Sequence, residues 1–476
     1  MSSEYHQAKY PVHLLMEHAE EREVEDNPLP DHLARKEAPK IPDVPVNEVV
    51  RHFNRLAQMN YGVDTGFYPL GSCTMKYNPK YTEKLAGLPD ATDIHPYQME
   101  DMNQGTLEIM YELQEMLSEI GGMHSTTLQP AAGAQGEITG LIIVHQYHEN
   151  NGEGDRNEVI LPDTAHGTNP ASAAMMGYKI VEIPSNEGCV DLEALKEAVS
   201  EKTAAFMLTN PNTLGIFEED VREIADIVHE AGGLLYYDGA NFNAIMGKTK
   251  PGLMNFDIIH YNLHKTFSTP HGGGGPGAGP VGVTEELSSY LPVPVVEKDG
   301  DKYTLNYNLE NSIGKVKGFY GNWIVLLKTY AYILRNGKDG LREVSERAVL
   351  NSNYLRKRLE NVLDLPYKPL RKHEFVLSGD KLKDKGLKTV DLAKRLLDYG
   401  LHAPTIYFPL IVSEALMIEP TETERKETLD KFADVIEKIM NEDPELLHDA
   451  PQNTAVKRVD ETKTIRDRVL SYKLRK

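Results

Sequence analysis

The chain has 476 residues, and its 72 Asp and Glu outnumber its 51 Lys and Arg to give a formal net charge of −21. This length is too great for one ordinary hydrophobic core, so we expect two domains. The acidic balance excludes nucleic-acid binding as the main function, because phosphate contacts need a stripe of Lys and Arg. The surplus of acidic groups is typical of a soluble protein.

The two cysteines, Cys73 and Cys189, are too few for a disulfide framework, which indicates a reducing compartment. The first residues lack the basic region and the apolar run of a signal peptide. The sequence also lacks the run of roughly 18 apolar residues that a membrane-spanning helix requires. We therefore expect a cytoplasmic protein that does not enter membranes.

Composition and hydrophobic spacing divide the chain into four parts. Prolines and charged residues fill residues 1–45, after which Val49, Val50, Phe53 and Leu56 follow the spacing of a helix. The predicted parts are an N-terminal arm and helix (1–60), a large cofactor-binding domain (61–330), a small C-terminal α+β domain (331–445) and a basic tail (446–476).

Residues 61–81 predict a loop that carries Ser72, Cys73 and Thr74 between prolines. One interpretation is an ordinary polar turn with a half-buried thiol. The other, equally supported, is a contact for a substrate that bears a carboxylate or sulfur. No base stands near Cys73 in the sequence, so the chain does not favour it as a nucleophile.

A small-residue turn at residues 130–136, which includes Ala134 and Gln135, is expected to open a helix. The first N–H groups of a helix and the positive end of its dipole suit a phosphate group. Small residues also serve close packing alone, so this pattern is weak by itself. A further amphipathic helix is expected at residues 105–120.

Strands and helices then alternate along the chain. This order predicts a parallel sheet, whose ligands lie beyond the carboxyl ends of the strands. The predicted strands are 159–162, 177–184, 204–208 and 234–237, and the predicted helices are 171–176, 191–199 and 221–231. Candidate site residues follow these strands directly, among them His166, Thr209 and Asp238.

The stretch around Lys265 carries the strongest chemical pattern. Ile258 and Ile259 end a buried strand, and a loop with Lys265 and the glycine run 272–275 follows. A surface lysine is the ordinary alternative, but this setting favours a desolvated amine with a lowered pKa. Such an amine can form a Schiff base with a carbonyl cofactor.

Lys265 together with Asp238 predicts a pyridoxal phosphate enzyme, because a carboxylate keeps the pyridinium nitrogen of that cofactor protonated. Ala240 beside Asp238 is small enough for a flat ring to lie close, although a turn aspartate is the plain alternative. His166 could stack on the ring, and His264 or His271 could contact phosphate or substrate. We predict no metal site.

Seven blocks resemble the glycine-cleavage P-protein family, which is glycine dehydrogenase (decarboxylating). They are YPLGSCTMKYNP, LQPAAGAQGE, DTAHGTNPASA, LTNPNTLGIF, YYDGAN, NLHKTFSTPHGGGGPGAGP and HAPTIYFPL, all within residues 45–445. The resemblance implies the α/β fold of fold type I pyridoxal phosphate enzymes, with a mostly parallel sheet in the large domain and a smaller C-terminal α+β domain.

The length of the chain matches only the cofactor-bearing C-terminal half of the family's long form, which resembles subunit 2 of its split form. The resemblance therefore implies a subunit 1 partner in an α2β2 heterotetramer. It also implies the reaction: glycine forms an aldimine with pyridoxal phosphate, CO2 leaves, and the aminomethyl group passes to the lipoyl group of H-protein.

Residue by residue, the resemblance implies that Lys265 carries the cofactor, that Asp238 pairs with its ring nitrogen and that His166 stacks on the ring. Ala134 and Gln135 form part of the phosphate cradle. The contacts to glycine stay open among Ser72, Cys73, Thr74, Asn210 and His264.

Two other classes of protein compete with this interpretation. A pyridoxal phosphate decarboxylase or desulfurase that needs no H-protein would share the fold, but the blocks around Cys73 and His166 argue against it. A structural subunit without cofactor is disfavoured by the presence of both Lys265 and Asp238.

Overall fold

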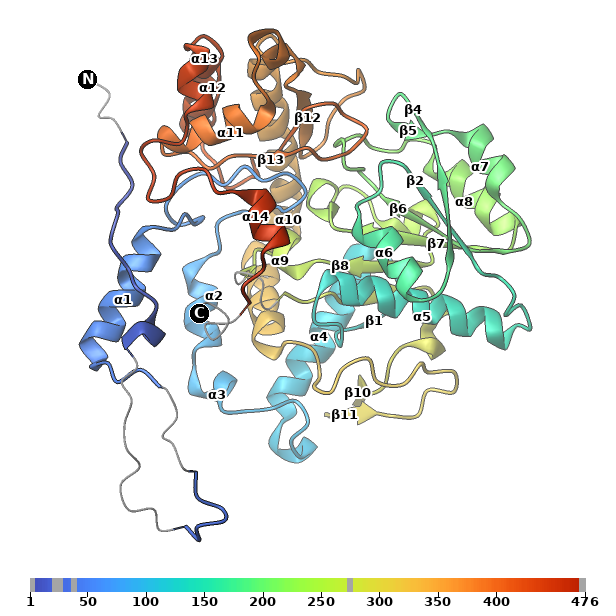
Figure 1. The fold of residues 1–476 in the computed structure, drawn as a ribbon. Helices are drawn as coiled ribbons and strands as arrows, with labels where there is room; N and C mark the ends of the chain where they lie inside the picture. Colours follow the sequence, from blue (N-terminus) through green and yellow to red (C-terminus); the bar gives the residue numbers. More distant parts are fainter. Residues whose placement is uncertain (1–4, 19–28, 36–40, 272–276, 471–476) are drawn as a thin grey trace.

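The computed structural model describes residues 5–18, 29–35, 41–271 and 277–470. The glycine run at 272–275, predicted to lie behind Lys265, falls outside these residues, as do the first and last residues of the predicted arm and tail. Figure 1 shows a large α/β body, a second and smaller layer near the C-terminus, and an N-terminal segment that runs along the outside.

A seven-stranded sheet in the order β1-β9-β8-β7-β6-β2-β3 forms the centre of the large body. The five strands from β8 to β3 pair in parallel, and β9 runs antiparallel to both of its neighbours. The strands are β1 Ser125–Thr127, β2 Glu158–Pro162, β3 Lys179–Ile183, β6 Thr203–Thr209, β7 Leu234–Gly239, β8 Ile258–Tyr261 and β9 Val281–Val283.

Alternate residues of the central strands face two different hydrophobic cores, as the period of two in a strand requires. Ile160 and Phe206 pack into one core with α4 and α8, whereas Val159 and Ala205 pack into the other with α5. Since both faces are covered, the strands consist of nearly continuous apolar residues. The predicted alternation of strands and helices is confirmed.

The helices have the following bounds. They are α1 Val46–Gln58, α2 Lys80–Ala86, α3 Pro89–Thr92, α4 Gln104–Gly121, α5 Gly133–Asn150, α6 Thr168–Met175, α7 Leu192–Ala198, α8 Val221–Glu230, α9 Leu263–Thr266, α10 Trp323–Leu359, α11 Thr389–Asp398, α12 Lys426–Met440, α13 Pro444–His448 and α14 Glu461–Arg466. Two hairpins, β4 Ser185–Asn186 with β5 Cys189–Val190 and β10 Val295–Asp299 with β11 Lys302–Asn306, complete the large body.

A second sheet with the order β12-β14-β13 lies near the C-terminus, and all of its pairs are antiparallel. Its strands are β12 Phe375–Ser378, β13 Thr405–Ile406 and β14 Ala415–Ile418. The long helix α10 connects the two bodies and kinks at Gly337, where φ is +61°.

One local prediction needs correction: Lys265 lies in the single-turn helix α9 rather than in a loop. Residues 295–306 form the hairpin of β10 and β11. Within the predicted loop 61–81, Leu70 forms an isolated bridge with Ile418 of β14. The limits of the domains stay a prediction.

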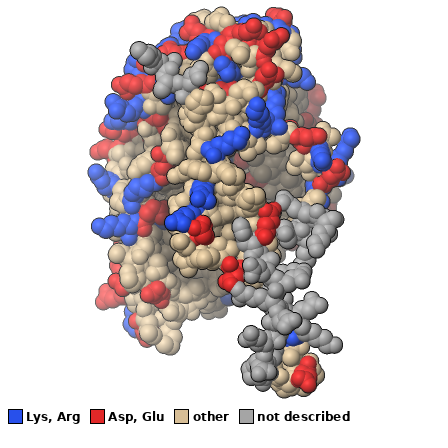
Figure 2. Space-filling view, turned by 60° about the vertical axis from the view of Figure 1, so that its left-hand side comes forward, with Lys and Arg blue, Asp and Glu red and all other residues tan. Residues whose placement is uncertain are grey.

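Helix α1 lies outside the body, next to the N-terminal segment (Figure 1). None of its residues is buried, and Val50 and Phe53 are more than half exposed, although the helix is strongly amphipathic. Figure 2 brings this side forward and shows Lys and Arg scattered among Asp and Glu, with a broad neutral area between them. No helix within the described ranges is long and apolar enough to cross a membrane.

Candidate active site

Four neighbouring strands of the large sheet carry the predicted site residues at one edge. His166 follows β2, Thr209 ends β6, Asp238 lies near the end of β7, and Lys265 follows β8. Thr209 and Asp238 are partners in the pairing of β6 with β7. The parallel order of these strands therefore brings together residues that are about a hundred positions apart in the sequence.

Lys265 is half-buried in α9 and is the electrostatic centre of the site. Its positive charge affects the protonation of surrounding groups from both bodies of the protein. These groups are Cys73, His166, Asp238, His260, His264, His271, His373, Glu374 and Glu419.

Asp238 is only 2% exposed, yet its environment favours the carboxylate form. Burial alone raises its pKa, but His260, a hydrogen bond from Asn169 Nδ2 (2.9 Å) and the charge of Lys265 together hold the pKa below its ordinary value. The backbone N–H of Ala240 also donates to Asp238 Oδ1, at 2.9 Å. A buried anion therefore faces the space next to Lys265.

His260 and Glu137 complete a group that we call the Asp238 cluster, made of Glu137, Asp238 and His260. His260 Nε2 lies 3.3 Å from Asp238 Oδ1, and its Nδ1 lies 2.8 Å from the Tyr236 hydroxyl. Burial and the charge of Asp238 raise the pKa of Glu137 to about 7. One carboxylate of the cluster is thus kept ionised while the other tends to keep its proton.

Helix α5 starts at Gly133, so Ala134 and Gln135 lie in its first turn, as predicted. The N–H groups of a first turn have no partner within the helix and can bind an anion. The backbone at Gly133 leaves no room for a side chain, because an added Cβ would collide with Asn262. The Gln135 side chain itself contacts backbone, accepting from Ala131 N and donating to Val316 O (both 2.7 Å).

Several buried polar atoms around Lys265 and Asp238 lack a hydrogen-bond partner within the described part of the chain. They are Thr209 Oγ1, His264 Nδ1, Thr266 Oγ1, Thr269 Oγ1 and His271 Nε2. Buried polar atoms are normally paired, so a group of unpaired ones indicates a polar ligand. Together with the α5 N-terminus and the Asp238 anion, they fit a flat cofactor that carries a phosphate.

The three histidines that the sequence predicted for the site are predominantly neutral. Burial lowers the pKa of His264 to about 3 and of His271 to about 4, and it lowers that of His166 as well. His166 Nδ1 lies 2.9 Å from Thr168 Oγ1, and its ring meets the Phe408 ring edge-on at 5.5 Å. Neutral rings can stack on a cofactor without an added charge; the individual roles stay predictions.

Ser72, Cys73 and Thr74 reach the site from another part of the chain. Ser72 and Thr74 have left-handed backbones, with φ of +66° and +50°. Ser72 N donates to Glu374 Oε2 at 2.7 Å, and Thr74 donates to Glu419 through both N (2.8 Å) and Oγ1 (2.6 Å). Burial raises the pKa of Cys73, which keeps it a thiol.

Asn210 is fully buried, and its side chain binds the backbone of Glu218. The structure also adds residues to which the sequence assigned no role. His260 lies opposite Asp238 in the sheet register, while Glu374 and Glu419 come from the small sheet. Strand alternation could have revealed His260, but only the tertiary structure brings the two glutamates near Lys265.

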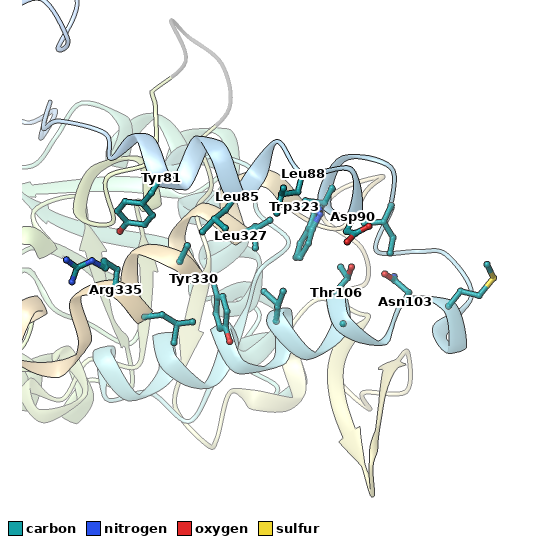
Figure 3. A pocket seen from close by; sticks show the side chains of 17 residues that line it. Tyr81, Leu85, Leu88, Asp90, Asn103, Thr106, Trp323, Leu327, Tyr330 and Arg335 are labelled. Carbon is teal, nitrogen blue, oxygen red and sulfur yellow. Dashed lines mark hydrogen bonds between the residues drawn. The ribbon is translucent and has the colours of Figure 1, made fainter.

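A separate cavity of about 670 Å³ lies between α2, α4 and the first half of α10. Figure 3 shows that mostly apolar side chains line it, including Leu85, Trp323, Leu327 and Tyr330. None of the predicted site residues lines this cavity. Its apolar lining contrasts with the polar site around Lys265.

Solved structures with the same fold define the class of protein. The chain matches the inhibitor-bound crystal structure of glycine decarboxylase (P-protein) of the glycine cleavage system with a TM-score of 0.73 at 20% identity, over 87% of this chain and 93% of that one. It matches Lactobacillus brevis glutamate decarboxylase with a TM-score of 0.64 at 15% identity, over 90% and 96%. The fold is that of the pyridoxal phosphate enzymes of fold type I.

Sequence comparisons then identify the family. Residues 21–307 match the family description "Glycine cleavage system P-protein", and residues 344–459 match "Glycine dehydrogenase, C-terminal domain". The chain belongs to the glycine cleavage system P-protein family. It is 60% identical over 460 residues to the probable glycine dehydrogenase (decarboxylating) subunit 2 of Pyrococcus abyssi, covering 95% of this chain and 92% of that protein. The same-named protein of Thermoplasma volcanium is 58% identical, over 94% of each chain.

Proposed function

We infer that this chain is the cofactor-bearing subunit 2 of glycine dehydrogenase (decarboxylating) and that it decarboxylates glycine in the glycine cleavage system. The observation that carries the proposal is the meeting of Lys265, the Asp238 anion and the N-terminus of α5 at one edge of the sheet. Relatives at about 60% identity that bear this name support the same conclusion.

Each group of the site has a distinct task in this reaction. When bound, pyridoxal phosphate supplies the electron sink for the pair of electrons that CO2 leaves behind. The Lys265 amine would hold the cofactor covalently. Asp238 would keep a proton on the ring nitrogen, because its buried carboxylate would stabilise a positive charge there.

Two further features orient the reactants. The first turn of α5, with Ala134 and Gln135, binds the phosphate. His166 would lie against the cofactor ring, and Ser72, Thr74 and His264 are the candidate contacts for glycine. The buried surroundings of these groups exclude water, which would otherwise protonate the carbon from which CO2 leaves.

The proposal includes two protein partners. The name subunit 2 of the relatives supports an assembly with subunit 1, for which we propose an α2β2 stoichiometry. The exposed apolar face of α1 and the apolar cavity between α2 and α10 are the surfaces that such a partner would cover. The second partner is H-protein, whose lipoyl disulfide accepts the aminomethyl group.

A cytoplasmic location belongs to the same proposal, and the free thiols of Cys73 and Cys189 support it. Glycine and the two proteins are the ligands expected, with pyridoxal phosphate as cofactor.

The exchange of labelled bicarbonate into glycine tests the function directly. The complete mixture of this chain, pyridoxal phosphate, subunit 1 and lipoylated H-protein should catalyse exchange, whereas omission of any one component should reduce it to near background. Full activity without subunit 1 would contradict the heteromeric part of the proposal. Release of free methylamine from glycine, without H-protein, would instead indicate an ordinary amino-acid decarboxylase.

A further inference from the structure

The small sheet supplies a second buried group of two carboxylates and a histidine, which we call the Glu419 cluster: His373, Glu374 and Glu419. All three side chains are 0% exposed. Glu374 directly precedes β12, and Glu419 directly follows β14. Both carboxylates face the segment 72–74, which lies more than 300 positions away in the sequence.

No Lys or Arg nitrogen of the described residues lies within 4.0 Å of Glu374 or Glu419, so neither carboxylate has a direct cationic partner. His373 is too far for a hydrogen bond, since its Nε2 lies 3.9 Å from Glu374 Oε1 and 3.8 Å from Glu419 Oε1. Two adjacent buried carboxylates without a direct ion pair are not both ionised at neutral pH, although the more distant charge of Lys265 acts on each of them.

The hydrogen bonds show which carboxylate carries the charge. Glu419 receives two donors from Thr74, and the hydroxyl bond of 2.6 Å has the length typical of an O–H···O⁻ contact. Glu374 receives Ser72 N, but its second donor, Asn241 Nδ2, also donates to the carbonyls of Pro211 and Asn212. The donor set thus favours charge on Glu419 and a proton on Glu374.

The same bonds hold a strained segment. Ser72 and Thr74 are not glycines, and a left-handed backbone costs each of them free energy that the surroundings must offset. Cys73 lies between them, and the backbone carbonyls of Cys73 and Thr74 interact with the His271 ring and oppose the lowering of its pKa by burial. The carboxylates therefore determine where the segment lies relative to Lys265.

We propose that Glu374 and Glu419 share one proton, neutral at Glu374 and ionised at Glu419, and that they are positioning residues which hold segment 72–74 against the Lys265 site. They act through that segment rather than on the reacting atoms. Since the reaction needs the segment in place, turnover depends on the ionisation of Glu419.

The direction of the pH dependence follows from the surroundings of Glu419. Burial raises its pKa to about 7, while the Thr74 donors and the charge of Lys265 oppose that rise and Glu422 adds to it. Burial and Glu419 hold the pKa of Glu374 far above its ordinary value. The nearby Lys76 binds Glu422, His373 is neutral, and Cys73 stays a thiol. Activity should accordingly fall as the pH drops through about 7.

The test measures glycine–bicarbonate exchange by the complete enzyme with subunit 1 and H-protein, across about pH 5.5 to 9. Glu374→Gln mimics the neutral acid and should keep kcat within about threefold of wild type. Glu419→Gln removes the charge that Thr74 binds and should lower kcat by about 10-fold or more. Glu218→Gln is the matched control, because Glu218 is also buried and accepts a backbone N–H (Val190, 2.7 Å) away from Lys265.

Two Thr74 variants keep the proposal testable if the Glu419 variant does not fold. Thr74→Val removes the hydroxyl donor, so it should raise the pKa of Glu419 and move the acid limb of the kcat profile upward by about one pH unit. Thr74→Ser retains the hydroxyl and should leave the limb in place. A limb that stays unchanged in Thr74→Val, or a Glu374→Gln variant as impaired as Glu419→Gln, would overturn the assignment.

Infrared spectra of the purified chain at about pH 8 give a readout that does not depend on catalysis. The difference between wild type and Glu374→Gln should contain the band of a protonated carboxyl group. Its absence would show that Glu374 is ionised. The alternative for these three side chains is a metal site, which metal analysis of the same sample tests. A divalent cation bound in stoichiometric amount would also refute the shared proton.

Discussion

The Asp238 cluster and the Glu419 cluster have the same composition, two carboxyl groups and one histidine, and both are buried near Lys265. Each cluster has one carboxyl group that tends to keep its proton, Glu137 or Glu374, but the two anions differ. The environment lowers the pKa of Asp238, whereas it raises that of Glu419 to about 7. Burial is similar in both clusters, so burial does not explain the difference.

The arrangement of donors explains it. Asp238 accepts hydrogen bonds from Asn169 Nδ2 and Ala240 N. The His260 ring lies 3.3 Å away, and both of its nitrogens contact neighbouring side chains. His373 has no hydrogen-bond partner on either nitrogen within the described residues and stays more than 3.5 Å from its carboxylates. The anion of the first cluster is therefore fixed, whereas the anion of the second takes up a proton as the pH falls through about 7.

The largest loss of activity is expected when Lys265, which lies near both clusters, is replaced. Lys265→Ala should lower exchange activity by about 10³-fold or more, because covalent attachment of the cofactor is lost. Borohydride reduction followed by peptide mapping should place the pyridoxyl group on Lys265 in the wild type. Lys248→Ala, which breaks only a surface ion pair with Glu346, is the control. A pyridoxyl label on another lysine would refute the assignment.

A change in the fixed anion of the first cluster should have the next largest effect. Asp238→Asn retains the shape but removes the charge that keeps the ring nitrogen protonated, so kcat should fall by about 10²-fold or more while the cofactor remains bound. Asp163→Asn alters an aspartate that directly follows β2, which is separated from β7 by β6, and should have little effect. Near-normal turnover of Asp238→Asn would contradict the electron-sink role.

A side chain at Gly215, next to the backbone of Glu374, should lower the stability of the protein. Gly215 has φ of +76°, and a Cβ there would overlap the carbonyl oxygen of Glu374. Gly215→Ala should therefore lower the free energy of unfolding by about 2–4 kcal/mol, measured by denaturant titration. Gly386→Ala isolates the cost of the left-handed backbone, about 1 kcal/mol, because its φ is +72° and nothing lies near the added Cβ. Equal losses in the two variants would show that the clash is relieved at no cost.

The smallest effect on activity is expected when Glu137, the second carboxyl group of the Asp238 cluster, is replaced. The folded state raises the pKa of Glu137 from its ordinary value of 4.5 to about 7. A raised pKa means that protonation favours the folded state: this contribution is complete below about 4.5 and is lost as the pH rises through about 7. Glu137→Gln should reduce the loss of thermal stability over this interval and change kcat by less than about threefold at neutral pH. An unchanged pH dependence of stability would mean that Glu137 is ionised throughout.

Much of the architecture and the centre of the site follow from the sequence. Apolar runs alternating with helical spacing place strands and helices, and a parallel sheet gathers whatever follows those strands at one edge. Lys265, Asp238 and Thr209 could be assigned to one site for that reason. The first turn of α5 was predictable as well, because small residues open it.

The charges of this site depend on contacts that form only when the chain folds. The single turn of α9 is too short for periodicity to reveal it, and the apolar run of β14 is only four residues long. The contacts of Ser72 with Glu374 and of Thr74 with Glu419 span 302 and 345 positions, and hydrophobic periodicity carries no information over such separations. The sequence determined which groups carry the chemistry, whereas packing of the small sheet against segment 72–74 determined their neighbours, because a pKa depends on distances and donors that exist only after folding.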